Sequence, residues 1–109
     1  MRNQIRLEDY RTPKAKIFTG RDRGIQVRED SKIDKLEEEF SIIEFIIPTN
    51  LYSINPSFFE ELFVNVVTKL GERGFYDKFK FINEGNYNYQ KPLDEAVTRI
   101  LRKKTALDI

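Results

Sequence analysis

The chain of 109 residues contains no cysteine, no histidine and no tryptophan. Without cysteine it can form no disulfide, no thiolate metal site and no cysteine nucleophile. Without histidine it has no Ser-His-Asp triad, no imidazole base or metal ligand, and no imidazole switch near neutral pH. Any chemistry therefore rests on carboxylates, hydroxyls, amides and cations. Absence of cysteine also suits a cytoplasmic protein, which is the location we expect.

An excess of charge of one sign is also lacking. The chain has 19 Lys and Arg residues against 18 Asp and Glu residues, a net charge of +1. Nucleic-acid surfaces need clustered cations, and here the cations near the C-terminus are explained by the dipole of a helix end. Tyr87 and Tyr89 lie among asparagines and could stack bases, but they lack a basic face around them. We expect no nucleic-acid partner.

Long apolar runs are missing as well. The longest, residues 42–48, is interrupted by Glu44, whereas a membrane span needs about 20 apolar residues. Residues 1–10 have no apolar core of a signal peptide, so we expect neither secretion nor membrane insertion. The four prolines and five glycines are scattered and mark no linker. We predict a single domain, 1–109, with a core at residues 4–104 and a frayed tail at 105–109.

Hydrophobic periodicity predicts an α/β fold. Residues 41–47 form the strongest strand, because consecutive β-branched and aromatic side chains imply burial on both faces of a central strand. Two-residue alternation predicts an N-terminal strand meander, in which residues 19–24 form a polar link bounded by Gly20 and Gly24. The other strand candidates are residues 4–7, 15–18, 25–28 and 79–82.

Helical spacing predicts one short helix and two main ones. Residues 31–40 form the short amphipathic helix. Ser57 and Glu60 have the spacing of a capping box at the start of a helix that Gly71 ends. Pro92 suits the first turn of the last helix, which runs to residue 103. The expected architecture is a mixed sheet of about four to five strands with these helices packed on it.

Four segments in order resemble the bacterial STAS-like domains of unknown function: residues 18–24, 27–28, 45–48 and 53–63. Those domains show a Gly-Arg turn early in the chain, a hydrophobic strand, and a Ser-Phe-rich helix start that ends in Glu-x-Phe. The resemblance covers residues 17–82, and residues 53–63 are its most specific part. It implies a STAS-like α/β fold.

The resemblance also implies a function. STAS domains proper include anti-anti-sigma factors, which are regulators without catalytic residues. A GHKL-type ATPase, which is both kinase and anti-sigma factor, phosphorylates a Ser or Thr at a helix start. The motif Asp-Ser-Ser-Gly of that family falls on Asn55, Pro56, Ser57 and Phe58. Proline occupies the usual acceptor position, so Ser57 or Ser53 would have to replace it.

Two further groups of residues are candidates for binding. Two arginines in a glycine-bounded turn could hold a phosphate or carboxylate, or form only a local pair with Asp22. An exposed aromatic side chain near the main helix start would make a protein-binding patch. The partner- or anion-binding candidates are Gly20, Arg21, Arg23, Gly24, Tyr52, Asn55 and Phe58.

No catalytic set is evident. The carboxylates at residues 37–39 and 60–61 lie on predicted helices, where solvated faces are expected, and no Walker or Rossmann glycine loop is present. An enzyme using carboxylates and Mg²⁺ is the weakest of three hypotheses. We therefore expect no catalytic residue, no metal and no cofactor.

The favoured hypothesis is a non-enzymatic regulatory module that binds a protein partner, such as a GHKL-type ATPase or kinase. The alternative is a small-ligand or nucleotide-sensing domain in which the Gly-Arg turn contacts an anion. An uncovered sheet edge in the N-terminal meander would also allow homo-oligomers.

Overall fold

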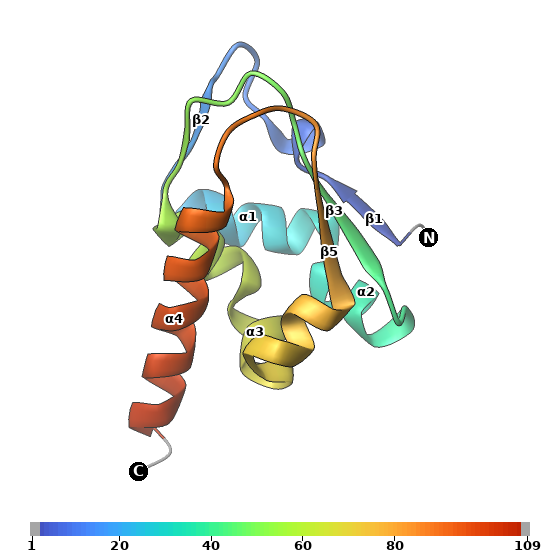
Figure 1. Cartoon of the computed structure of the whole chain (residues 1–109), viewed down its shortest axis with the longest axis vertical. Helices are drawn as coiled ribbons and strands as arrows, with labels where there is room; N and C mark the ends of the chain where they lie inside the picture. Colours follow the sequence, from blue (N-terminus) through green and yellow to red (C-terminus); the bar gives the residue numbers. More distant parts are fainter. Residues whose placement is uncertain (1–2, 108–109) are drawn as a thin grey trace.

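The computed structural model describes residues 3–107 and shows an α/β fold (Figure 1). In chain order, its elements are β1 (Gln4–Arg6), the 3-10 helix η1 (Leu7–Tyr10), β2 (Ile17–Phe18), α1 (Arg21–Ser31), α2 (Ile33–Glu39), β3 (Ile43–Ile47), β4 (Ser53–Ile54), α3 (Pro56–Lys78), β5 (Phe79–Asn83) and α4 (Gln90–Leu107).

The strands form two small parallel sheets. The first has the order β1-β3-β5, and the second pairs β2 with β4. Within β3, Ile43, Phe45 and Ile47 are completely buried, which confirms the prediction of a central strand. The predicted single mixed sheet is wrong, because every strand pair within residues 3–107 is parallel and the strands divide between two sheets.

The predicted N-terminal meander is also wrong. β1 pairs with β3 and β2 with β4, so neighbours in the meander are not neighbours in a sheet. Residues 25–28 lie within α1 instead of forming a strand. The alternating pattern of residues 25–28 also fits a helix. The buried positions of α1, Gly24 and Val27, are three residues apart, which places them on one face of the helix. β1 and β5 are the edges of the larger sheet, and a homo-oligomer formed through an uncovered edge of the N-terminal strands stays a prediction.

The two main helices are longer than their sequence signals predict. Gly71 has φ 76° and ψ 173°, so it interrupts the helix as expected, but the chain resumes helical geometry up to Lys78. α4 begins at Gln90, with Pro92 in its first turn, where a missing N–H is tolerated. It continues to Leu107, beyond the predicted end at residue 103, and residues 108–109 lie outside the described part. The single domain with a frayed tail at residues 105–109 stays a prediction.

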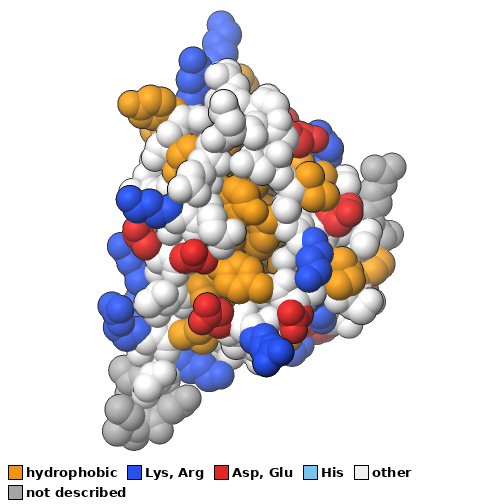
Figure 2. All heavy atoms as spheres, viewed as in Figure 1, with side chains coloured by type: hydrophobic (Ala, Val, Ile, Leu, Met, Phe, Trp, Pro, Cys, Tyr) orange, Lys and Arg blue, Asp and Glu red, His pale blue; other side chains and the backbone are white. Residues whose placement is uncertain are grey.

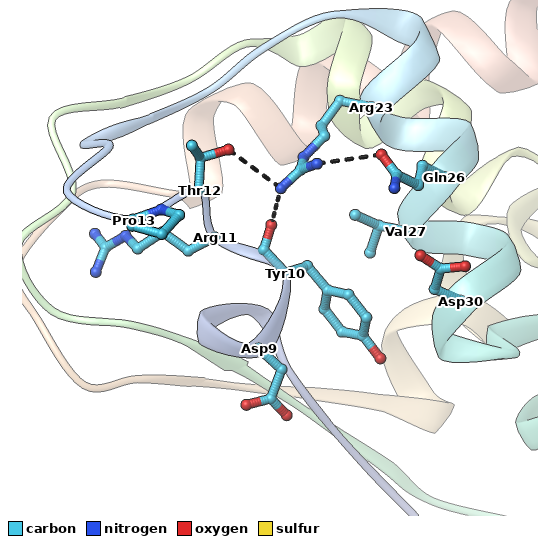
Figure 3. Close-up of a pocket in the computed structure, with 9 residues that line it drawn as sticks. All are labelled: Asp9, Tyr10, Arg11, Thr12, Pro13, Arg23, Gln26, Val27 and Asp30. Carbon is cyan, nitrogen blue, oxygen red and sulfur yellow. Dashed lines mark hydrogen bonds between the residues drawn. The ribbon is translucent and has the colours of Figure 1, made fainter.

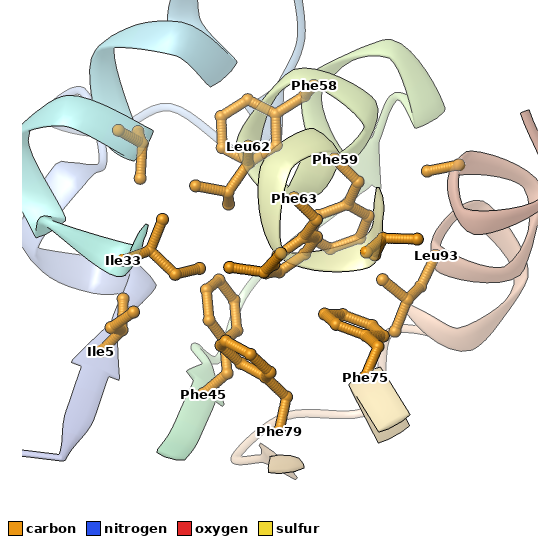
Figure 4. Packing of buried hydrophobic residues seen from close by; sticks show 14 of the residues in the cluster. Ile5, Ile33, Phe45, Phe58, Phe59, Leu62, Phe63, Phe75, Phe79 and Leu93 are labelled. Atoms are coloured by element: carbon orange, nitrogen blue, oxygen red, sulfur yellow. The ribbon is translucent and has the colours of Figure 1, made fainter. Parts of the chain in front are cut away.

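The core lies between the β1-β3-β5 sheet and the helices, with α3 packed between α1 and α4 (Figures 1 and 4). Hydrophobic side chains reach the surface between α4 and β5 on the face that Figure 2 shows. Phe63 on α3 is fully buried at its centre. Its ring centroid lies between 5.1 and 6.1 Å from those of Phe45, Phe59, Phe75, Phe79 and Phe81. Edge-to-face and tilted aromatic packing of this kind anchors α3 to β3 and β5 and so fixes the position of its first turn.

Candidate functional site

The helices α1 and α3 begin next to each other. The short parallel strands β2 and β4 lead directly into α1 and α3, and the carboxyl ends of parallel strands meet at one edge. The N–H of Asn55 donates to the carbonyl of Phe18 at 2.8 Å, which links the two strand ends. We call this region the helix-start surface and define it by Ile17, Gly20, Arg21, Tyr52, Ser53, Asn55 and Ser57.

Asn55, not Ser57, caps α3. Its Oδ1 accepts hydrogen bonds from the backbone N–H of Ser57 at 2.9 Å and from the Ser57 hydroxyl at 2.8 Å. Pro56 occupies the first helical position, where its missing N–H has no cost. The predicted capping box is therefore wrong: the cap lies two residues earlier, and Glu60 is buried among cations instead of facing the cap.

We expect Asn55→Ala to lower the free energy of unfolding by about 1 kcal/mol, because the backbone N–H and the hydroxyl of Ser57 lose their acceptor. Urea denaturation measures this loss. Asn86→Ala, at an exposed loop position, is the matched control and should change stability by less than about 0.5 kcal/mol. Equal effects of the two substitutions would contradict the capping role.

Gly20 and Gly24 do not bound a turn. Gly20 has φ 94° and precedes α1, a backbone conformation that glycine adopts most readily. Gly24 lies inside α1, where a Cβ atom would stand 2.4 Å from the carbonyl oxygen of Phe58. The predicted turn is thus wrong, whereas binding of a partner or an anion at Gly20 and Gly24 stays a prediction. Gly24 allows the close approach of α1 to α3, which a longer side chain would prevent.

Arg21 and Arg23 both bind groups of their own chain. Arg21 lies 3.3 Å from a carboxylate oxygen of Glu60 and 3.7 Å from one of Glu61. The guanidinium of Arg23 donates to the carbonyl of Tyr10, to the hydroxyl of Thr12 and to the side chain of Gln26 (Figure 3). Both arginines tie α1 to its neighbours, which leaves them less free to hold an external anion.

Arg23 also lines a hollow of about 330 Å³ between α1 and the segment that follows η1 (Figure 3). Asp9 and Asp30 line the same hollow, so its walls carry both signs of charge. Burial raises the pKa of Tyr10 there, and the charges of Asp9 and Asp30 raise it further. The phenol consequently stays neutral. Because Asp9 and Asp30 line the hollow together with Arg23, their negative charges oppose the binding of an anion there.

The two aromatic candidates for partner binding, Tyr52 and Phe58, differ in their exposure. Tyr52 is 79% exposed, whereas Phe58 is completely buried against Phe18, with ring centroids 5.2 Å apart. The prediction that Phe58 contacts a partner is wrong, because this first-turn position faces the core. Ser53 pairs with Ile17 between β4 and β2, and Ile17 is 50% exposed. The N–H of Tyr52 donates to the carbonyl of Lys16 at 2.7 Å, so an ordered backbone presents its exposed ring.

Sequence reasoning missed an ion cluster centred on Glu60. Its side chain is only 3% exposed and lies 2.6 Å from Lys103, 3.3 Å from Arg21 and 3.9 Å from Arg99. Burial alone would raise the pKa of Glu60, but hydrogen bonds and charges from Lys103 and Arg21 outweigh burial and lower it. The cluster joins α1, α3 and α4. A signal existed: Glu60 shares the three- and four-residue spacing of the buried Phe63 and Val67.

The other carboxylate cluster, residues 37–39, was predicted to be solvated, and the structure agrees only in part. Glu38 and Glu39 are exposed as expected, but Glu37 is buried. Across residues 3–107, no group of three or more carboxylate, histidine or cysteine side chains could hold a metal ion. Within the same residues, no helix combines the length and apolar character that crossing a membrane requires.

Comparison with protein-family models, with curated proteins and with solved structures finds no match for this chain. The motifs of residues 17–82 therefore remain the basis of the STAS-like resemblance.

Proposed function

We propose that this protein is a non-enzymatic regulatory module that binds a protein partner through the helix-start surface. The observation that carries the proposal is the exposure of two large side chains: Tyr52, directly before β4, and Ile17 in β2, the strand that pairs with β4. An exposed tyrosine held by a rigid backbone loses little conformational entropy on binding, and such residues often dominate interface energetics.

A GHKL-type ATPase or kinase is the partner class we propose, on the strength of the STAS-like resemblance. The motif that the resemblance aligns with Asp-Ser-Ser-Gly lies directly after β4, at the first turn of α3. A phosphate on Ser57 would meet the positive end of the α3 dipole, which favours negative charge. Ser53 is the second acceptor candidate, in β4 itself.

Anion or nucleotide sensing is the alternative function, and it has less support. It would require Arg21 and Arg23 to release Glu60, Glu61 and the acceptors around residues 10–12. A thermal-shift series with nucleotides and phosphate tests it directly. Stabilisation that Arg23→Gln abolishes would favour this alternative over the protein-binding module.

We expect Tyr52→Ala to weaken binding of a purified GHKL-type ATPase from the same source by about tenfold or more, because a central aromatic contact is lost. Isothermal titration calorimetry with each such ATPase measures the affinity. Ile17→Ser should weaken binding too.

Ile82→Ser is the matched control, because Ile82 is 40% exposed on β5 and lies outside the helix-start surface. The melting temperatures of all three variants should stay close to that of the wild type. An ATPase that binds the wild type and all three variants with equal affinity would contradict this surface. If no GHKL-type ATPase bound the wild type, the partner class would be wrong.

A further inference from the structure

Strand β5 has one paired edge and one free edge. Within residues 3–107, β3 is its only neighbour in the sheet. The N–H of Glu84, directly after β5, donates to the carbonyl of Ile47 in β3 at 2.9 Å. Successive residues of a strand direct their N–H and C=O groups to opposite edges, so Ile82 also faces β3, whereas Phe81 and Asn83 direct theirs to the free edge. That edge therefore offers backbone donors and acceptors to another strand.

The core opens to the surface beside this free edge. Phe81 on β5 and Tyr89, directly before α4, stack with their ring centroids 5.5 Å apart, and both are only partly buried. Figure 2 shows hydrophobic side chains at the surface between α4 and β5. A strand added to β5 would place its own core-facing side chains next to Phe81 and cover this opening. Backbone pairing combined with adjacent apolar surface is the usual basis of strand addition.

The sequence of β5 is complementary to itself. Lys80, Ile82 and Glu84 are exposed and alternate with the core-facing Phe79 and Phe81, so they share the open face of the sheet. In an antiparallel pair of two β5 strands centred on Ile82, each Lys80 lies opposite Glu84 of the second copy. An in-register parallel pair would instead place Lys80 beside Lys80, which is unfavourable. Charge complementarity thus favours a second copy of this chain as the added strand.

The same register uses the free backbone groups. When Ile82 lies opposite Ile82, Phe81 of each copy lies opposite Asn83 of the other. These are the residues that direct their N–H and C=O groups to the free edge, and such facing pairs exchange two hydrogen bonds in antiparallel ladders. Side chains and backbone therefore select one and the same alignment of the two strands.

We propose that two copies of this chain dimerise by antiparallel pairing of their β5 edges, with Ile82 next to the twofold axis. The pairing joins the two β1-β3-β5 sheets into one and closes the assembly, because each copy has a single β5 edge. The interface shares no residue with the helix-start surface. The proposed function and the dimer can therefore fail independently.

Sedimentation velocity of the full chain over a range of concentrations tests the dimer. We expect a reversible monomer–dimer equilibrium with a dissociation constant of about 10–100 µM, because the interface is small. Lys80→Glu and Glu84→Lys should each raise this constant by about tenfold, because like charges then face each other at both ends of the strand pair. The double variant, in which the two charges are exchanged, should dimerise like the wild type.

Lys35→Glu is the matched control for these charge reversals. It makes the same change of charge as Lys80→Glu at an exposed position on α2 and should dimerise like the wild type. Circular dichroism checks that each variant is folded. If Lys80→Glu failed to fold, Glu84→Lys would still provide the comparison, because Glu84 is exposed and lies after the end of β5.

Cross-linking reads the register directly, because the chain has no cysteine of its own. Residues facing each other in a non-hydrogen-bonded antiparallel pair have Cα atoms about 4.5 Å apart, a distance that a disulfide spans. Mild oxidation of Ile82→Cys should therefore give a disulfide-linked dimer on a non-reducing gel. Ile42→Cys is the matched control: Ile42 is also 40% exposed but lies directly before β3, away from the free edge, and should stay monomeric.

Efficient cross-linking of Ile82→Cys and rescue by the exchanged charges would support the dimer. A chain that stays monomeric at every concentration would overturn it and leave a strand of another protein as the occupant of the edge. Equal cross-linking of the two cysteine variants, or a dimer that neither charge reversal weakens, would also overturn the pairing through β5.

Discussion

Glu60→Gln is expected to lower the free energy of unfolding by about 2–3 kcal/mol. The substitution keeps the shape of the side chain but leaves Arg21, Arg99 and Lys103 facing a neutral amide that is itself buried. The three cations are 49%, 44% and 65% exposed, so water still solvates them and the loss stays below that of a fully buried pair. Urea denaturation measures the difference.

Glu61→Gln is the matched control for this prediction. Glu61 neighbours Glu60 on α3 but is 23% exposed, and its ion pair with Arg21 is longer, at 3.7 Å. We expect a change of less than about 1 kcal/mol, as for other partly exposed ion pairs. Equal losses for the two substitutions would mean that Glu60 contributes only as one more surface charge.

The effect of Glu60 depends on pH with a definite sign. Its pKa in the folded protein lies below the ordinary value of 4.5, because hydrogen bonds from Lys103 and Arg21 favour the carboxylate. The stability that this carboxylate provides is therefore fully present above pH 4.5 and is lost as the pH falls through the folded-state pKa. The gap between wild type and Glu60→Gln should be constant at neutral pH and shrink in acid. A gap that widened in acid would contradict the charged state assigned to Glu60.

The strands of the larger sheet could largely be predicted from sequence, because their patterns depend on local side chains. Residues 43–47 are β-branched or aromatic at four of five positions, and the structure places them in β3. β1 and β5 also lie where alternation or aromatic content predicts them. Which strands pair was not predictable, because the partner of β2 is separated from it by α1, α2 and β3.

The candidate site was predicted less well, since its properties come from tertiary contacts. The position of the α3 start was predicted to within two residues, but whether Asn55 or Ser57 caps it depends on the direction of the Asn55 side chain. Exposure of Tyr52 and burial of Phe58 likewise depend on where the β2–β4 ribbon meets the helices. Only the spacing of Glu60 with Phe63 and Val67 carried a usable signal for its burial.

The misinterpretation of residues 20–24 has one physical origin. A glycine that bounds a turn and a glycine at a helix contact look alike in sequence, because both tolerate no side chain. Gly20 has the positive φ that a turn-type glycine needs, whereas the space around its missing side chain is open. Gly24 shows the opposite combination, with helical geometry and no space. The two glycines should therefore respond differently to the same substitution.

Gly24→Ala is expected to lower the free energy of unfolding by about 2–4 kcal/mol, although alanine is the better helix former by about 1 kcal/mol. The added Cβ would stand 2.4 Å from the carbonyl oxygen of Phe58 and 3.0 Å from Cβ of Glu61. These neighbours are backbone or close to it, so α1 has to move away from α3 as a unit. Arg28 opposes that movement, because it donates to the carbonyl of Glu61 at 2.6 Å.

Gly20→Ala measures the cost of backbone strain in a position where an added Cβ overlaps with no other atom. The position has φ 94° but no atom within 4 Å of an added Cβ, so only the strain of about 1–2 kcal/mol applies. Chemical denaturation of both variants should rank Gly24→Ala as the more destabilising. Displacement of α1 would also carry Arg21 away from Glu60, so Gly24→Ala and Arg21→Ala should cost less together than the sum of their separate effects. Strict additivity, or a Gly24→Ala variant as stable as the wild type, would show that α1 and α3 are not held at this distance.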